Sequence, residues 1–457
     1  MQYPRFLELS NLLLVFTYLI IVIIVVFIIS KNFIKDKKNK DIFFKAFLFK
    51  IIMGLGFALV YEYIYDWNGD SYYYYKNSSA LSDVFFVDTS SYFKMFFNTI
   101  DQSNYFSLPS YLPYYPRLYD RGIYAIHRFL SVFAIIGFKN YYLMSIILNS
   151  FLFIINWKFF RFLCLIFPDK FKIFAITILL FPSVTFWGSG LTKDGFTLSF
   201  CFVFIMCFYK LFLQLKFKVK HILLLLLSFY VLRELKPYIL YSVLISCMVW
   251  IALHYSKKIK NIVIKYLFFP IIIVVFGISG FFILQKTASN VGGAYSSVNA
   301  MLTKASAAQY DLKQEYYQGS SFDIGDLEPN MKSAIDILPA AIIAGIFRPF
   351  LWEARSVTVL ISGLENFILL LIALYIIYLS FKKSFIHLFR IIFRNPFLIF
   401  CIFFSIIMAV GIGISTSNFG ALVRFKIPFF PFFAIFLLFL CSELKEQKVN
   451  KRTKSKV

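Results

Sequence analysis

The stretch Tyr61-Glu-Tyr-Ile-Tyr-Asp-Trp-Asn-Gly-Asp-Ser-Tyr-Tyr-Tyr-Tyr75 marks where an apolar segment ends and the longest polar loop begins. Asp66 and Asp70 lie where a membrane helix would emerge into water. Asn68-Gly69 between them favours a turn, because Gly tolerates positive φ and Asn nearly so. The carboxylates can serve chemistry at a membrane surface. Alternatively, the stretch is a solvated helix end within a belt of interfacial Tyr and Trp.

The composition is typical of a membrane protein. Of 457 residues, 60% are hydrophobic and 15% are charged, whereas a soluble domain has about 45–50% apolar and 25% charged residues. Several runs reach the roughly 20 apolar residues that cross a bilayer. We therefore predict that residues 1–457 form a single all-α, polytopic integral membrane domain with about 11–12 transmembrane helices.

The net charge of +24 does not indicate nucleic-acid binding. The Lys and Arg residues are concentrated in short loops between apolar runs, as orientation signals are. The six cysteines lie in or beside apolar segments, which indicates packing and not a disulfide framework or zinc site. The four histidines are widely scattered. The sequence thus predicts no nucleic-acid partner, no metal site and no cofactor.

The charge pattern also predicts the topology. A span at 11–30 precedes the lysine-rich residues 31–40, which indicates an outside N-terminus and a cytoplasmic first loop. The next span, 42–64, delivers Asp66 and Asp70 to the exterior. Two large external loops carry interfacial helices at 122–137 and 333–346, and a basic tail is cytoplasmic. The loops are 65–140 and 286–355, the tail is 442–457, and the other predicted spans with clear bounds are 141–163, 173–187, 195–213, 238–255, 265–284, 356–379, 397–415 and 429–441.

Two polar interruptions stand out within apolar sequence. Residues 222–232 are too few to cross a bilayer, and Arg233-Glu-Leu-Lys236-Pro237 separates them from the next apolar run. Two short helices can meet at this break within the membrane, where ionisable residues indicate function, or the break can be a plain external turn. Glu365 falls inside a predicted span, where pairing with a neighbouring Arg would offset the cost of its charge.

The unusual polar residues all fall on the predicted exterior side. An enzyme that acts on a lipid-linked substrate would gather them at one face, whereas a transporter would place them near the midplane. Arg and Lys bind phosphate, and a carboxylate can take a proton from an attacking hydroxyl. The candidates are Asp70 and Asp66 as base, Arg233, Lys236, Arg348, Arg424 and Lys193 on the phosphate side, and Asp194, Trp352, Glu353 and Lys426 as further site residues.

Lys193 and Asp194 have a second interpretation. They can form an ion pair at the start of the predicted span 195–213, since Asp is favourable at a helix N-terminus.

The order of these features resembles the GT-C superfamily of multi-span glycosyltransferases. Members carry an acidic motif in the first large external loop, and Tyr65-Asp-Trp-Asn-Gly-Asp-Ser-Tyr72 matches it in place and character. Three other stretches resemble motifs of membrane proteins from bacterial surface-polysaccharide clusters: Pro182 to Asp194, Phe347 to Glu353, and Arg424 to Pro428.

The resemblance implies an inverting, base-assisted glycosyltransferase of the bacterial inner membrane with Asp70 as base and Asp66 second. Some members hold a divalent metal with a DxD motif, but Asp66 and Asp70 have a wider spacing, so no metal is expected. The donor would be a polyprenyl-phosphate-linked sugar, the acceptor a glycan, and the setting membrane lipid. The alternatives are an O-antigen or capsule repeat-unit polymerase or ligase, and, from another class, a flippase or transporter of lipid-linked glycans.

Overall fold

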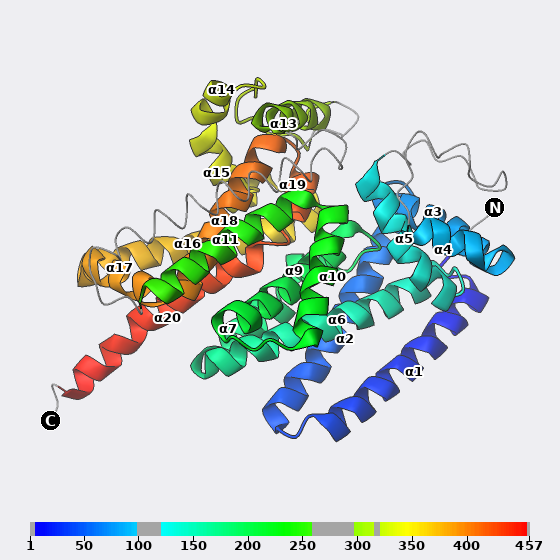
Figure 1. Cartoon of the computed structure of the whole chain (residues 1–457), viewed down its shortest axis with the longest axis horizontal. Coiled ribbons are helices and arrows are strands. Elements are labelled where there is room, and N and C mark those ends of the chain that lie inside the picture. Colours follow the sequence, from blue (N-terminus) through cyan, green and yellow to red (C-terminus); the bar gives the residue numbers. More distant parts are fainter. Residues whose placement is uncertain (1–4, 98–119, 258–296, 315–319, 455–457) are drawn as a thin grey trace.

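The computed structural model describes residues 5–97, 120–257, 297–314 and 320–454, which form an all-α bundle (Figure 1). The helices of the N-terminal half are α1 (Leu9–Phe33), α2 (Lys37–Tyr63), α3 (Asp70–Val87), α4 (Thr89–Phe97), α5 (Arg121–Ile136), α6 (Tyr141–Ile166), α7 (Phe171–Phe174), α8 (Pro182–Trp187), α9 (Lys193–Phe208), α10 (Val219–Leu235) and α11 (Pro237–Ser256). Those of the C-terminal half are α13 (Val298–Leu312), α14 (Met331–Asp336), α15 (Leu338–Phe347), α16 (Val357–Lys383), α17 (Phe385–Arg394), α18 (Pro396–Ser415), α19 (Phe419–Phe425) and α20 (Phe430–Lys454).

Seven helices of the described residues are long and apolar enough to cross a membrane. They are α1, α2, α6, α9 with the π-helical turn that follows it, α11, α16 and α18. The bent pair of α19 and α20, which meet at 69°, makes an eighth if it counts as one span. The predicted all-α, multi-span fold is confirmed. The number of spans in the described residues is lower than the 11–12 predicted, and the predicted span 265–284 lies outside those residues.

One predicted span, 173–187, is not a continuous helix. The chain forms the four-residue α7, a π-helical turn at Ala175–Leu179, a break, and then the six-residue α8. Pro182 explains the break, because proline has no N–H to donate and pushes the residue before it out of helical geometry. Phe181 accordingly has extended backbone angles. Hydropathy alone does not reveal this interruption.

The lysine-rich ends of the helices gather at one end of the bundle, the basic end. Lys38 at the start of α2 lies 3.9 Å from the ring centre of Phe171. Lys170 pairs with Glu443 of α20 at 2.9 Å, and Lys257 after α11 donates to the carbonyl of Arg394 at the end of α17. These contacts confirm that basic segments far apart in sequence share one side. Figure 1 shows the C-terminus and α17 at this end.

The opposite end carries the starts or ends of the same helices together with the short helices. A glycine at the start of α5, Gly122, lies against the carbonyl of Leu235 at the end of α10 and the Lys193 ammonium at the start of α9. A backbone N–H at Phe6, before α1, donates to Glu62 near the end of α2 at 3.0 Å. This end also holds α3, α13, α14 and α19 (Figure 1), and it is where some of the predicted site residues meet.

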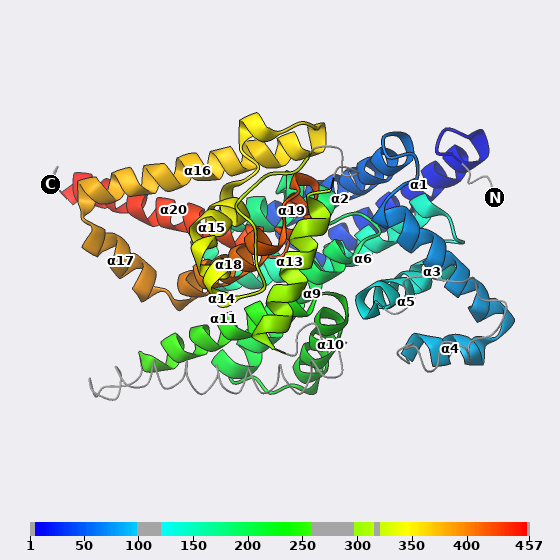
Figure 2. The ribbon, with the colours of Figure 1, turned by 90° about the horizontal axis from the view of Figure 1, so that it is seen from above.

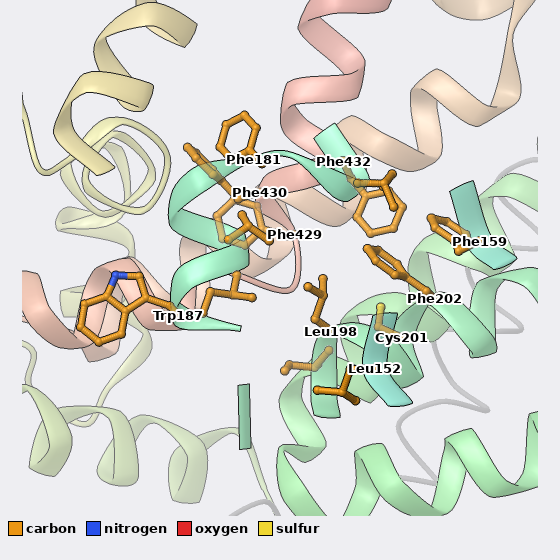
Figure 3. Packing of buried hydrophobic residues seen from close by; sticks show 14 of the residues in the cluster. Leu152, Phe159, Phe181, Trp187, Leu198, Cys201, Phe202, Phe429, Phe430 and Phe432 are labelled. Atoms are coloured by element: carbon orange, nitrogen blue, oxygen red, sulfur yellow. The ribbon is translucent and has the colours of Figure 1, made fainter. Parts of the chain in front are cut away.

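Phenylalanine rings form the core that fixes these helices. Phe159 of α6 stacks on Phe202 of α9, with ring centres 4.3 Å apart and planes 7° apart. Phe432 of α20 meets Phe202 at 5.8 Å, nearly edge-on (Figure 3). At the start of α8, Phe181 meets Phe430 in the same way. Such offset and edge-on ring pairs contribute beyond the area that they bury, so they lock three spans and the broken segment into one body.

The short helix α8 is held at both ends by buried charges. Glu365 of α16 accepts the backbone N–H of Ser183 at 2.8 Å and also its hydroxyl. Lys50 of α2 donates to the carbonyl of Gly188 at 2.8 Å. A carboxylate at the N-terminal end and an ammonium at the C-terminal end both complement the helix dipole. The expectation that Glu365 pairs with an arginine is therefore wrong, because the free N–H groups of α8 satisfy it.

Helices α15 and α18 touch backbone to backbone through glycines. A Cβ added at Gly413 would overlap the carbonyl of Ala341, whereas one added at Gly411 would meet nothing. Gly413→Ala should therefore force the helices apart and lower the free energy of unfolding by about 1–3 kcal/mol. Gly411→Ala should be neutral or stabilise by up to about 1 kcal/mol. Thermal unfolding of the two purified variants measures the difference, and equal midpoints would contradict this packing.

Candidate functional site

Four charged residues from distant segments form one cluster, the Asp194 cluster: Asp70, Asp194, Lys236 and Arg424. Asp194 is 1% exposed and lies in the first turn of α9. Its carboxylate accepts from the Lys236 ammonium at 2.5 Å and from Nε of Arg424 at 3.2 Å. A buried carboxylate is stable only when it is paired and hydrogen-bonded, and two cations meet that need here.

Asp70 joins the cluster through Arg424. Its carboxylate lies 3.1 Å from the Nη1 of Arg424, so this guanidinium bridges Asp70 and Asp194. The two carboxylates differ in environment, since 45% of the Asp70 side chain is exposed and 1% of the Asp194 side chain. Asp194 therefore holds the cations in place, and Asp70 presents an oxygen to the outside.

The backbone before α3 sets the position of Asp70. Gly69 has φ +97°, in the left-handed region that favours glycine, and a Cβ there would lie 3.2 Å from the Tyr61 ring. The chain can thus pass close to Tyr61 and begin α3 at Asp70. The predicted positive φ at Gly69 is present, but the hydrogen-bonded turn lies at Asp66-Trp67, where the N–H of Asn68 donates to the carbonyl of Tyr65 at 2.8 Å. The carboxylate at the first helical position also benefits from the helix dipole.

Asp66 lies outside the cluster. It is exposed, and together with Trp67 it adopts a left-handed conformation, with φ of 44° and 59°. No ion pair joins Asp66 to a cation within the part of the chain that the structure describes. Of the two carboxylates predicted as base, the structure brings only Asp70 to the cations.

Lys236 occupies the break between α10 and α11, where the sequence predicts two helices meeting at a polar interruption. The helices do meet there, and Pro237 begins α11. Burial would lower the pKa of Lys236, but the carboxylate of Asp194 outweighs it and raises the pKa above its ordinary value. The Lys236 ammonium is therefore charged at neutral pH and balances Asp194.

Lys193 lies beside the cluster, and the predicted ion pair with Asp194 does not form. Its ammonium lies 5.8 Å from the ring centre of Tyr74, and Asp194 pairs with Lys236 and Arg424 instead. No ion pair is present for Lys193 among the described residues. The start of α9 is capped by Thr192, whose hydroxyl accepts the N–H of Asp194. The Lys193 ammonium can therefore donate hydrogen bonds to a ligand.

Two buried tyrosines, Tyr61 and Tyr74, frame the cluster and were not predicted as site residues. Both are under 10% exposed. Burial, and then the negative charge of Asp70, raise the pKa of Tyr74 well above its ordinary value. The phenol therefore stays protonated and adds no negative charge to the site. In the sequence these residues are two among 30 tyrosines, so no pattern sets them apart.

A second buried ion group lies next to the break. Glu234 pairs with Arg121 at 2.6 Å and with Arg128 at 3.3 Å, and the Arg128 side chain is fully buried. This group ties α5 to the end of α10. Arg233, predicted on the phosphate side, has no ion pair among the described residues, and its buried Nε has no hydrogen-bond partner there. Arg233 therefore does not contribute to the Asp194 cluster.

Arg348 forms a separate group with Glu353. The guanidinium pairs with that carboxylate at 2.6 Å and lies 4.8 Å from the ring centre of Phe322. Trp352 is 74% exposed and stacks on Phe350. These predicted candidates lie together, but no ion pair or hydrogen bond links them to Asp70 or Asp194 among the described residues. Arg348, predicted on the phosphate side, therefore does not join the Asp194 cluster.

Lys426 serves the fold. Its ammonium donates to the carbonyl of Ile346 at 2.8 Å and to that of Arg348, at the C-terminal end of α15. A cation there complements the helix dipole and satisfies carbonyls that have no partner within the helix. This explains why a lysine lies at the end opposite the basic end. The Lys426 ammonium is bonded to backbone carbonyls, so we do not assign it to phosphate binding.

His127 makes the folding stability at the site end depend on pH. Burial, and then the charge of Lys193, lower the pKa of His127 to about 3, against the opposite effect of Asp120. The unfolded histidine titrates near 6.5, so its contribution to stability is full above that pH and is lost as pH falls toward 3. The expected slope is about 1.4 kcal/mol per pH unit. His127→Gln should flatten the fall of the melting midpoint between about pH 6.5 and pH 5; an unchanged slope would contradict this assignment.

Among the described residues, no three His, Cys, Asp or Glu side chains come close enough together to hold a metal ion. Arg424 of the cluster and the neighbouring Lys193 can instead bind an anion, and Asp70 can accept a proton. No family model matches the chain, and no curated protein or solved structure matches it. Its function must therefore be argued from the geometry of the Asp194 cluster.

Proposed function

We propose that this chain is a membrane glycosyltransferase that transfers a sugar from a polyprenyl-phosphate carrier to a glycan acceptor during surface polysaccharide synthesis. One observation carries the proposal: Asp70, Asp194, Lys236 and Arg424, from segments far apart in sequence, converge at one end of a membrane bundle. A base and phosphate-binding cations at the membrane rim are what a lipid-linked sugar donor requires.

The orientation follows from the distribution of charge. Cytoplasmic loops of membrane proteins are enriched in Lys and Arg, so the basic end faces the cytoplasm and the Asp194 cluster faces the other side. The N-terminus then lies outside, since Phe6 contacts Glu62 at the cluster end. The C-terminal tail lies inside, because Glu443 of α20 pairs with Lys170 at the basic end. In a bacterium the membrane is the inner one and the donor is used at its outer face.

The reaction assigns one role to each group. The acceptor hydroxyl attacks the anomeric carbon of the donor sugar, and Asp70 takes the hydroxyl proton. The bond between that carbon and the phosphate oxygen breaks, and polyprenyl phosphate leaves with the electron pair. Lys193 and Arg424 stabilise the charge that grows on the phosphate. Asp194 and Lys236 touch no substrate in this scheme; they hold Arg424 in position.

The rival class is a flippase of lipid-linked glycans, which needs charged groups that line a path through the bundle. Three charged residues, Lys50, Glu365 and Lys426, are buried within the bundle. Each of them is hydrogen-bonded to the end of a helix. The cavity beside Lys50 has a volume of about 10 Å³, room for no more than a single water. These contacts favour the enzyme.

Glycan intermediates in a strain that lacks the gene test the proposal. A missing transferase leaves truncated repeat units on the lipid carrier, and this is the expected result. A missing polymerase leaves complete single units on the outer face, and a missing ligase leaves full-length polymer on the carrier. Complete units retained on the cytoplasmic side identify a flippase. Any of the last three patterns would overturn the proposal of single-sugar transfer.

A further inference from the structure

The helix α17 at the basic end carries two stripes of different character. Ile386, Phe389 and Phe393 are all more than half exposed, and their spacing places them on one face of the helix. His387, Arg390 and Arg394 repeat the same spacing one residue later and so form a second, basic face. An exposed apolar face beside a basic face is the pattern of a helix that lies in a membrane surface.

The basic face of α17 lines a cavity of about 500 Å³. The other side of the cavity is formed by Phe167, Phe439 and Glu443, which follow or belong to α6 and α20. The two rings are in edge-on contact with centres 5.5 Å apart, so this wall is apolar apart from Glu443. The cavity therefore pairs a cationic side with an apolar side at the end of the bundle where α17 lies along the surface (Figure 2).

The charges in this cavity are not balanced by the protein. Glu443 is already paired with Lys170 at 2.9 Å. Within the residues that the structure describes, no ion pair joins Arg390 or Arg394 to a carboxylate. The Nε2 of His387 is buried and has no hydrogen-bond partner there. Arg390 and Arg394 are exposed, so both guanidinium groups are open to an anionic ligand, whereas the Nε2 of His387 is not.

We propose that this cavity binds the phosphate of an anionic phospholipid from the leaflet in which α17 lies. Arg390 and Arg394 donate to the phosphate oxygens in charge-assisted hydrogen bonds. The rings of Phe167 and Phe439 contact the glycerol and the upper acyl chains. The exposed face of α17 places the cavity at headgroup level. This site is separate from the Asp194 cluster and does not depend on the proposed transfer reaction.

The test uses the full-length protein in nanodiscs of phosphatidylcholine with or without phosphatidylglycerol. Each basic residue near an anionic surface contributes about 1 kcal/mol, so Arg390→Gln/Arg394→Gln should weaken retention of phosphatidylglycerol by roughly thirtyfold. The measurement is native mass spectrometry of lipids that remain bound after release from the nanodisc. Arg390→Lys/Arg394→Lys keeps the charge and should retain more lipid than the glutamine pair.

The matched control is Lys35→Gln/Lys37→Gln, which removes two exposed charges at the turn between α1 and α2. It should retain the lipid as the unchanged protein does. Equal losses in both double variants would show binding to charge in general and overturn the proposal. So would unchanged retention in the arginine variant. Inorganic phosphate can also be added to the protein in phosphatidylcholine nanodiscs. If it stabilises the protein against thermal unfolding as much as phosphatidylglycerol does, the cavity binds a soluble anion, and the proposal is overturned as well.

Discussion

Asp70→Asn should reduce surface glycan synthesis by about 10²–10⁴-fold while the protein still inserts and folds, because a general base contributes about that factor. The asparagine keeps the shape but cannot take the proton of an attacking hydroxyl. Folding should survive, since the Asp70 side chain is 45% exposed and Arg424 keeps its bond to Asp194. Glycan analysis of cells that carry the variant, with immunodetection of the protein in membranes, measures both quantities.

The matched control for this variant is Asp83→Asn. Asp83 lies on the same helix and pairs with Lys139 through side chains that are 55% and 46% exposed, so its loss should leave glycan synthesis unchanged. Normal glycan with Asp70→Asn would remove Asp70 from the mechanism. A fall with both variants would indicate a fault in α3 and not a lost base.

Asp194→Asn should unfold the cluster end, which is the second large effect. The change leaves the Lys236 ammonium and the Arg424 guanidinium buried without a full negative charge. Breaking a buried ion pair by removing one partner costs about 3–5 kcal/mol. The variant should therefore melt well below the unchanged protein in a thermal unfolding measurement of the purified chain in detergent.

A second change separates charge imbalance from lost packing. Lys236→Met added to Asp194→Asn removes one of the two unbalanced cations and should recover part of the lost stability. Asp70→Asn is the comparison on the exposed side of the same Arg424, and it should cost no more than about 1 kcal/mol. If Asp194→Asn and Asp70→Asn have the same melting midpoint, Asp194 is not the residue that anchors the cations.

The sequence predicts the class of fold and the gathering of basic helix ends well, and it predicts contacts poorly. Apolar runs and loop charges follow from the bilayer itself, so α1, α2, α6, α11, α16 and α18 lie close to the predicted ranges. The broken segment before α8 was missed, because hydropathy does not register a proline that interrupts a helix. The positive φ at Gly69 and the break at Lys236 were predicted from local chemistry, and both are present, although the turn itself lies at Asp66-Trp67.

The partners of the site residues could not be predicted, because they depend on how helices pack. Sequence proximity suggested Lys193 with Asp194, but the fold brings Lys236 and Arg424 to that carboxylate. Lys426 and Glu365 were unusual for their predicted places, and both are explained by helix ends that needed a charge. Arg348 lies at the same end of the bundle but pairs with Glu353, its neighbour in sequence.

The most direct test of the account is the release of polyprenyl phosphate by the purified protein. Lipid-linked sugars extracted from a strain that lacks the gene serve as donor, glycan from the same strain serves as acceptor, and lipid products are separated by chromatography. We expect the unchanged protein to release polyprenyl phosphate in step with sugar transfer, and Asp70→Asn to release almost none. Equal release by both proteins, or no release by the unchanged protein while the donor crosses the bilayer of a liposome, would contradict the account.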